Sequence, residues 1–386
     1  MAVDTMPEAK RGRRGGLGEG QAREETAEVE AYYVASQWQL IWWKFRKHRL
    51  ATIAAPVLIV LYLSAIFADF LSPYLPDERN ASARFAPPQL IRFRDMEGNW
   101  QAPFVYGLTR ITDPETLRRT FEINPEEKYP VEFLGHGREY KLLGLFRTDI
   151  HLIWSEGPMQ LLGTDDLGHD LFSRILYGSR ISLSIGLVGV TITFTLGMIV
   201  GGISGYLGGT VDTLVQRTID LLISIPTIPL WMSLAAALPR DWPPLRIYLG
   251  IVVITSVIGW AGLARVVRGK LLALREEDFA MAARLAGARD MRIIMRHMLP
   301  SFASYIIVSL TLSIPGTILG ETSLSFIGLG LQPPVVSWGV LMQQAQNVVA
   351  IAHYPWLLFP ALWIVVTVLM FNFLGDGLRD AADPYK

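Results

Sequence analysis

Residues 181–206 read ISLSIGLVGVTITFTLGMIVGGISGY, and this stretch decides the fold. It carries no charged residue, and it is longer than the roughly 20 residues that an α-helix needs to cross the hydrocarbon layer of a membrane. Small residues recur in it at four-residue spacing at Gly197, Gly201 and Gly205, which lets two helix backbones approach closely inside lipid. The stretch therefore predicts a spanning helix that packs tightly against another helix.

Comparable apolar stretches recur on both sides of this one. They lie at residues 50–71, 213–238, 248–267, 301–319 and 356–374. The composition agrees with a membrane protein, because 51% of the residues are hydrophobic and only 18% are charged. We predict an all-α integral membrane protein of about six transmembrane helices, with residues 181–386 forming a five-helix core.

Two of the predicted spans contain residues that interrupt helices. Pro226 and Pro229 lie in the third span, and Pro315 with Gly316 lies in the fifth. Proline removes a backbone donor, which is tolerated in membranes where neighbouring helices or a water-filled path satisfy the freed groups. The prolines indicate either kinks beside a translocation path or ordinary packing kinks.

The segment before the first span divides into two parts. Residues 1–30 are rich in Gly, Glu and Arg, and we expect a disordered tail because they have too few large apolar groups to bury. Residues 31–49 place Trp38, Trp42 and Phe45 at helical spacing and end in basic residues. This pattern favours an amphipathic helix in the membrane interface, the alternative being a simple basic flank.

Basic residues predict the orientation. The flank before the first span and the loop at 265–296 are both rich in arginine, and short loops of that kind stay in the cytoplasm. Both termini are then cytoplasmic, and residues 72–180 form an enlarged extracytoplasmic insertion. Its short runs at 131–134, 140–143 and 151–154, set between turn residues, predict strands and hence a partly β lobe.

Several kinds of chemistry are missing from the sequence. There is no cysteine, and no phosphate-binding loop of the form GxxxxGK[ST] occurs, since Gly269-Lys270 is followed by Leu271. Metal-ligand spacing is also missing, and the net charge of zero gives no reason to expect nucleic acid. The sequence predicts a non-enzymatic protein that binds no cofactor or metal itself.

Ionisable residues within the spans are few. We expect Arg217 and Asp220, one helical turn apart, to form a local salt bridge, and Glu321 to reach solvent at the outer end of its span. His169 lies beside Asp165, Asp166 and Asp170, a group that suits a cation site or, in our preferred interpretation, a polar turn and helix cap. A self-contained ion-coupled carrier remains an alternative, and so does a membrane-anchored sensor.

The loop at 268–299 is long for a hairpin between spans and is patterned as a helix. Acidic residues precede the stretch Phe279–Ala288, as is favourable at the start of a helix. Within this stretch, a face of mostly small apolar residues includes Phe279, Ala282 and Ala283. Gly287 suits a helix terminator. Such a helix fits a groove on a soluble partner. The alternative is a solvated connector.

These motifs resemble one family, the permease subunits of ABC importers in the dipeptide, oligopeptide and nickel group. The loop stretch FAMAARLAGA at 279–288 and the Leu299-Pro300 pair resemble the family's EAA signature, with Met281 where glutamate is usual. LGTDDLGHD at 162–170 resembles its LGTDxLGRD motif, with His169 in place of arginine. GLGLQPP at 328–334 and SWG at 337–339 resemble the loop after its fifth span.

The resemblance implies a type I importer permease in a bacterial cytoplasmic membrane. Such a chain forms half of the translocation path with a homologous second permease, receives solute from an extracytoplasmic binding protein, and is driven by two ATPase subunits that bind ATP and Mg. Peptides are the expected cargo, with nickel or opine- and sugar-type solutes as alternatives. The residues implied in ATPase coupling are Phe279, Ala282, Ala283, Gly287, Ala288, Leu299 and Pro300, and the family leaves residues 84–160 unexplained.

Overall fold

The computed structural model describes residues 36–382, apart from 113, 115–118 and 240. The predicted disordered tail at 1–30 and the first part of the predicted interfacial helix therefore lie outside the described residues.

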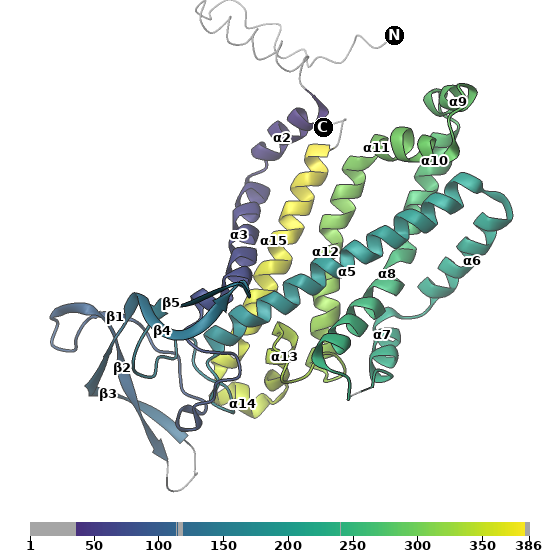
Figure 1. The fold of residues 1–386 in the computed structure, drawn as a ribbon. Helices are drawn as coiled ribbons and strands as arrows, with labels where there is room; N and C mark the ends of the chain where they lie inside the picture. The colour runs from purple at the N-terminus through teal and green to yellow at the C-terminus, as the bar shows by residue number, and fades with distance from the viewer. Residues whose placement is uncertain (1–35, 113, 115–118, 240, 383–386) are drawn as a thin grey trace, which may run out of the picture.

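Long apolar helices form the body of the molecule (Figure 1). Five stretches are long and apolar enough to cross a membrane, and a sixth is a pair of helices bent by 87°. The five contain α3 (Arg49–Ile66), α5 (Leu171–Leu207), α8 (Pro244–Arg275), α12 (Ala303–Phe326) and α15 (Phe359–Ala382), and the bent pair is α6 (Gly209–Ser224) with α7 (Thr227–Ala236). The predicted helical membrane fold is confirmed.

The ends of these helices differ from the predicted spans because polar ends extend them. α5 begins at Leu171 rather than 181, since Asp170 caps it by accepting a hydrogen bond from the Ser173 N–H. α8 continues to Arg275, beyond its apolar stretch. Hydrophobicity marks only the part of a helix that lies in lipid, so the capped extensions were missed.

The prolines act differently in the two spans. Pro226 lies at the break between α6 and α7, and Pro229 lies in the first turn of α7, where its missing N–H removes no helical hydrogen bond. α12, in contrast, continues as one helix through Pro315 and Gly316.

A small β lobe precedes α5, as predicted. β1 (Arg92–Arg94), β2 (Trp100–Thr112) and β3 (Arg119–Pro130) form an antiparallel sheet, and β4 (Glu132–Leu142) pairs with β5 (Phe146–Trp154) in a hairpin. Val105, Val131 and Met159 form the apolar centre of the lobe. The β4–β5 hairpin contains the runs predicted as strands, whereas β1, β2 and β3 were not predicted.

Shorter helices complete the chain. They are α2 (Gln37–Lys47), α4 (Ala68–Leu71), η2 (Ala81–Ala83), α9 (Asp278–Leu285), α10 (Asp290–Ile293), η3 (Ile294–Met298), α11 (Leu299–Ser301), α13 (Trp338–Met342), η4 (Gln343–Gln346), α14 (Val348–His353) and η5 (Pro355–Leu358). α2 begins with a capping box between Ser36 and Gln39, and its Phe45 packs beside Ala51 and Ala381.

The long helices separate two ends of the molecule (Figure 1). The end that carries the β lobe, α13 and α14 is called the lobe end. The opposite end, which carries α2, α9, α10 and α11, is called the loop end. Between them, Leu183, Ile318 and Phe371 from three helices pack in one apolar core with Trp338, which is fully buried and donates from Nε1 to the Ile175 carbonyl at 3.1 Å.

Candidate functional site

The segment between α8 and α12 protrudes at the loop end. α9 is shorter than the predicted helix over 279–288, because the chain turns at Gly287, whose φ of +78° is a left-handed conformation that favours glycine. The Gly287 N–H donates to the Arg284 carbonyl, and the Ala288 N–H donates to the Ala283 carbonyl. Gly287 thus ends the helix, as the sequence indicated.

α9 has one anchored face and one free face. Ala280 is buried at 3% exposure in an apolar cluster with Leu271 and Met298, and half-buried Ala283, Ala288 and Leu299 pack against that cluster. The exposed apolar side chains are Phe279, Met281, Ala282 and Leu285, with Leu285 90% exposed. Pro300 is exposed in the first turn of α11.

The structure divides the residues of α9 between its buried and exposed faces differently from the sequence prediction. Ala283 was placed on the free face, but it packs on the protein's own core, and the buried Ala280 was not singled out. Leu285 was not singled out either, although it is the most exposed large apolar side chain of this loop. A run of alanines predicts a helix face of small side chains, but it does not predict whether that face packs against the protein or is exposed.

Tyr206, in the last turn of α5, fixes this loop to the bundle. Its hydroxyl donates to Asp290 Oδ1 and accepts from Arg284 at 3.3 Å, while its backbone carbonyl accepts from Arg275 at 3.3 Å. The Arg284 guanidinium also lies 5.8 Å from the centre of the Tyr206 ring. One residue of α5 thus contacts three segments of the loop, a link that sequence reasoning missed because the partners lie far apart in the chain.

Charged pairs join the helices near the loop end. The Arg268 guanidinium on α8 donates two hydrogen bonds to the Asp212 carboxylate on α6. Asp212 also accepts a hydrogen bond from Ser204 at 2.6 Å. The predicted salt bridge between Arg217 and Asp220 was wrong, because Asp220 pairs instead with Arg265 on α8 at 2.5 Å. Asp220 pairs with Arg265 rather than with Arg217 because α6 and α8 lie side by side.

The glycines of α5 lie where this helix passes close to α8. A Cβ atom on Gly201 would be 2.5 Å from the Ala264 carbonyl oxygen, and one on Gly205 would be 2.7 Å from that of Arg268. A Cβ atom on Gly197 would meet the Leu263 side chain at 2.9 Å. No side chain fits at the first two positions unless the backbones move apart.

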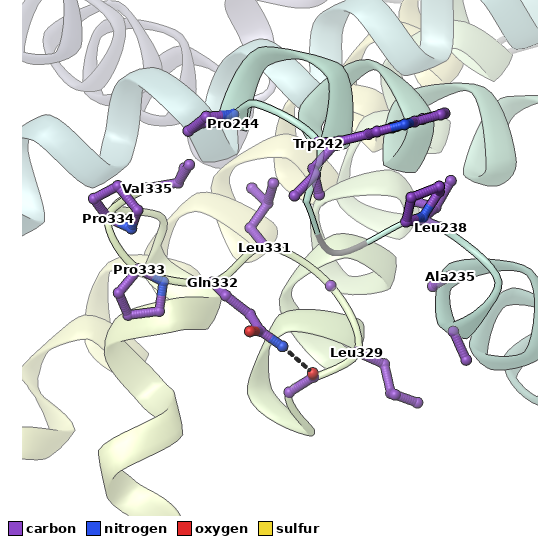
Figure 2. A pocket seen from close by; sticks show the side chains of 15 residues that line it. Ala235, Leu238, Trp242, Pro244, Leu329, Leu331, Gln332, Pro333, Pro334 and Val335 are labelled. Atoms are coloured by element: carbon purple, nitrogen blue, oxygen red, sulfur yellow. Dashed lines mark hydrogen bonds between the residues drawn. The ribbon is translucent and has the colours of Figure 1, made fainter.

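A pocket of about 190 Å³ lies at the lobe end, and most of the residues that line it are apolar. Figure 2 shows these side chains. One wall is the connection between α7 and α8, including Leu238 and Trp242, and the other is the segment after α12, including Leu329 and Pro333. Gln332 donates to the Gly328 carbonyl at 2.6 Å and holds the second wall in a turn (Figure 2). The pocket therefore joins the bent helix pair to the GLGLQPP segment.

Glu321 is buried, and the expectation that it reaches solvent was wrong. Its side chain is fully buried, and its Oε1 accepts hydrogen bonds from Ser325 at 2.7 Å and Ser337 at 2.8 Å. Gly339 allows this cover, since a Cβ atom there would lie 2.8 Å from the Thr322 Cα. The carboxylate thus ties the SWG segment to α12 by hydrogen bonds.

The LGTDDLGHD segment forms a polar turn before α5. Asp165 contacts His169 and Arg174, and these hydrogen bonds and charges hold its pKa below the usual value although burial acts to raise it. Asp170 caps α5, so the turn and cap interpretation is confirmed. Within the described ranges, no group of three His, Cys, Asp or Glu side chains is arranged to hold a metal ion.

The fold and these features define a class: a multi-pass membrane protein of five or six apolar spans with a protruding helix at one end. The family described as "Binding-protein-dependent transport system inner membrane component" matches residues 194–385, and "N-terminal TM domain of oligopeptide transport permease C" matches residues 36–88.

Curated relatives agree with these matches. A glutathione transport system permease protein of Escherichia coli is 31% identical over 92% of this chain and 93% of its own length. An oligopeptide permease protein of Haemophilus influenzae is 42% identical over 61% of this chain and 75% of its own, and a dipeptide permease protein of Bacillus subtilis is 41% identical over 58% and 68%. The chain therefore belongs to the family of inner-membrane permease subunits of ABC importers, in which a separate subunit hydrolyses ATP.

Proposed function

We propose that this chain forms half of the translocation path of a peptide importer and that α9 docks on an ATPase subunit. The observation that supports this proposal most directly is the exposed apolar face of α9. This face lies at the loop end, on a helix anchored through Ala280 and Tyr206. An exposed leucine beside small side chains suits insertion into a groove of a partner protein. Phe279, Ala282 and Gly287 would lie in that contact, whereas Ala283, Ala288 and Leu299 would support it from below.

Coupling requires that α9 and the spanning helices move together. ATP can shift the importer between its conformations only through a difference in affinity for them, so the contact that carries this difference must be firm. The bonds of Tyr206 to Asp290 and Arg284 give α9 such a link to α5.

The orientation we propose puts the loop end in the cytoplasm. Lys44, Arg46 and Lys47 end α2 at this end, and Arg292 and Arg296 follow α9 there. Basic residues close to spans are retained on the cytoplasmic side. The lobe end would then face the solute-binding protein, and a homologous second permease would complete the path.

The bent pair α6–α7 and the pocket beside it are our candidates for this chain's share of the path. Irregular backbone at membrane depth is tolerated where it lines a cavity or lies within protein, and the break at Pro226 is followed by α7, which reaches the pocket through Ala235 and Ala236. We propose a peptide as cargo because the relatives above are named for dipeptide, oligopeptide and glutathione transport.

The docking role is tested with Leu285→Asp in the assembled complex. A charge on this 90% exposed side chain should leave the fold intact but lower ATPase affinity at least about ten-fold, as expected for a central interface residue. The matched control is Leu145→Asp, 76% exposed on the lobe, which should leave ATPase recovery unchanged. Equal recovery of the ATPase with both variants would contradict the docking role.

A further inference from the structure

A second cavity, of about 410 Å³, lies between the β lobe and the start of α5. Its wall combines three separate parts of the chain: the segment after the first span, the β4–β5 hairpin with its exit, and the polar turn before α5. The charged residues that line it are Glu78, Arg138, Glu156 and Asp170. Three carboxylates and one guanidinium leave the lining with an excess of negative charge.

Asp170 is the central observation. Its side chain is 94% buried, since only 6% is exposed, and its Oδ2 caps α5 by accepting from the Ser173 N–H at 2.8 Å. Its Oδ1 is fully covered and has no hydrogen-bond partner among the residues that the structure describes. Burial raises the pKa of Asp170 to about 7 although the Ser173 hydrogen bonds act to lower it, and the nearby charges of Asp165 and Glu78 raise it further. A buried carboxylate oxygen without a partner is costly, so the site lacks a donor.

Glu78, which also lines the cavity, shows the same pattern. Its Oε1 pairs with Arg138 at 2.8 Å, while its Oε2 is covered and without a partner in the described part of the chain. Tyr74 and Trp154 add aromatic rings to the lining, and the Tyr74 hydroxyl accepts from the Met159 N–H at 2.8 Å. Two unpartnered carboxylate oxygens at a cavity with aromatic rings in its lining are the surroundings that protein sites offer to an organic cation.

We propose that this cavity binds the ammonium group of a small solute, and that the Asp170 and Glu78 side chains turn towards it so that Asp170 Oδ1 and Glu78 Oε2 accept its N–H groups. An ammonium has N–H donors for both oxygens, and its charge balances the excess on the wall. A metal ion fits less well, because the described residues include no group of three His, Cys, Asp or Glu side chains arranged to hold one. Since the wall joins the lobe to the cap of α5, an occupied site would also hold these two parts together.

The test uses the purified full chain in deuterated detergent at pH 7.5, with saturation-transfer NMR of ethylammonium as the probe. We expect ethylammonium to bind, n-propanol not to compete with it, and tetramethylammonium, which has no N–H donor, to compete at least ten-fold more weakly. Asp170→Asn keeps an oxygen for the helix cap and should lower ethylammonium affinity about ten-fold or more. Glu78→Gln should lower it in the same direction.

Glu126→Gln, on exposed β3, is the matched control and should leave binding unchanged. Binding that is equal in Asp170→Asn, Glu78→Gln and the wild-type chain, or no binding of ethylammonium at all, would overturn the proposal. Displacement of ethylammonium by calcium at lower concentration would also overturn it, in favour of a metal site. These measurements involve no transport, so their failure would leave the proposed importer function untouched.

Discussion

At the scale of single residues, Tyr206 is the point where the loop end meets the bundle. Its hydroxyl bonds to Asp290 and Arg284, on both sides of the turn that ends α9, while its backbone belongs to α5. Tyr206 therefore gives α9 a hydrogen-bonded link to α5, in addition to the apolar packing of Ala280. Tyr206 acts as a positioning residue in our account, because it holds α9 in place without facing the ATPase itself.

Tyr206→Phe should weaken this link without removing α9 from its partner. The Tyr206 hydroxyl makes two hydrogen bonds, and each contributes about 1 kcal/mol. We therefore expect the number of peptides taken up per ATP hydrolysed to fall at least about five-fold. The measurement is the ratio of uptake to ATP hydrolysis in proteoliposomes that contain the whole importer. Tyr305→Phe, in the first turn of α12, is the control. A ratio that stays at the wild-type value in Tyr206→Phe would remove the positioning role.

Two glycines on facing helices should respond in opposite ways to the same change. Gly201→Ala puts a methyl group 2.5 Å from the Ala264 carbonyl oxygen and should destabilise the chain by about 1–3 kcal/mol. Gly262→Ala meets nothing within 4 Å and should stabilise α8 by up to about 1 kcal/mol, since alanine favours helices. Thermal unfolding of both variants in detergent checks the pair. Shifts of the same sign would show that close approach does not decide the role of Gly201.

At the scale of elements, hydrophobicity and length predict the long helices because a bilayer sets a minimum apolar length. The same signal cannot place their ends. α5 starts at Leu171 because Asp170 caps it, and caps depend on hydrogen bonds rather than on hydropathy. The break at Pro226 follows from the missing donor of proline, whereas the unbroken α12 depends on the neighbours that surround Pro315.

The candidate sites were predicted unevenly for the same reason. The sequence located α9 and its terminator Gly287, because alanine spacing and a left-handed glycine are local signals. Its anchored side depends on Tyr206, and the pairing of Asp220 depends on Arg265, contacts between segments that are distant in the chain. Local patterns carry no information about such contacts.

The β lobe presents an apolar hairpin tip at the lobe end. Leu145 is 76% exposed and Phe146 is 67% exposed, between β4 and β5 and at the start of β5. We expect this tip to contact the solute-binding protein, since neighbouring exposed apolar side chains mark interaction sites. The double variant Leu145→Asp with Phe146→Asp should raise the binding-protein concentration needed for half-maximal uptake about ten-fold, with ATPase recovery unchanged.

This prediction separates the lobe from the loop. If the double variant loses its ATPase, or if its uptake depends on binding-protein concentration as in the wild-type importer, the lobe does not have the receiving role. Removal of residues 84–160 is a harsher test, because it breaks bonds to the polar turn before α5. The Phe85 N–H donates to the Asp165 carbonyl, and Ala86 exchanges hydrogen bonds with Thr164. The point variants keep these bonds intact.

At the scale of the whole molecule, the bundle separates the lobe from the protruding loop (Figure 1). Solute reception and ATPase docking would then occur at opposite ends of the same spanning helices, with α5 extending between them from Asp170 to Tyr206. The buried Glu321 and its serine partners bind the SWG segment to α12 near the lobe end, and the Asp212–Arg268 pair binds α6 to α8 near the loop end. Such cross-links favour rigid movement of the core.

The docking of α9 is the central claim, and the lack of cysteine in the sequence allows a direct test. A single Leu285→Cys is placed in the assembled importer in native membranes, and a short reagent that joins cysteine to lysine is added, with Leu145→Cys as the matched exposed position. Our account predicts a cross-linked product of this chain with the ATPase subunit from Leu285→Cys and none from Leu145→Cys. Two results together would contradict the account. The cysteine at 285 would give no such product, and membrane-impermeant reagents would label it from the same side of the membrane as the cysteine at 145.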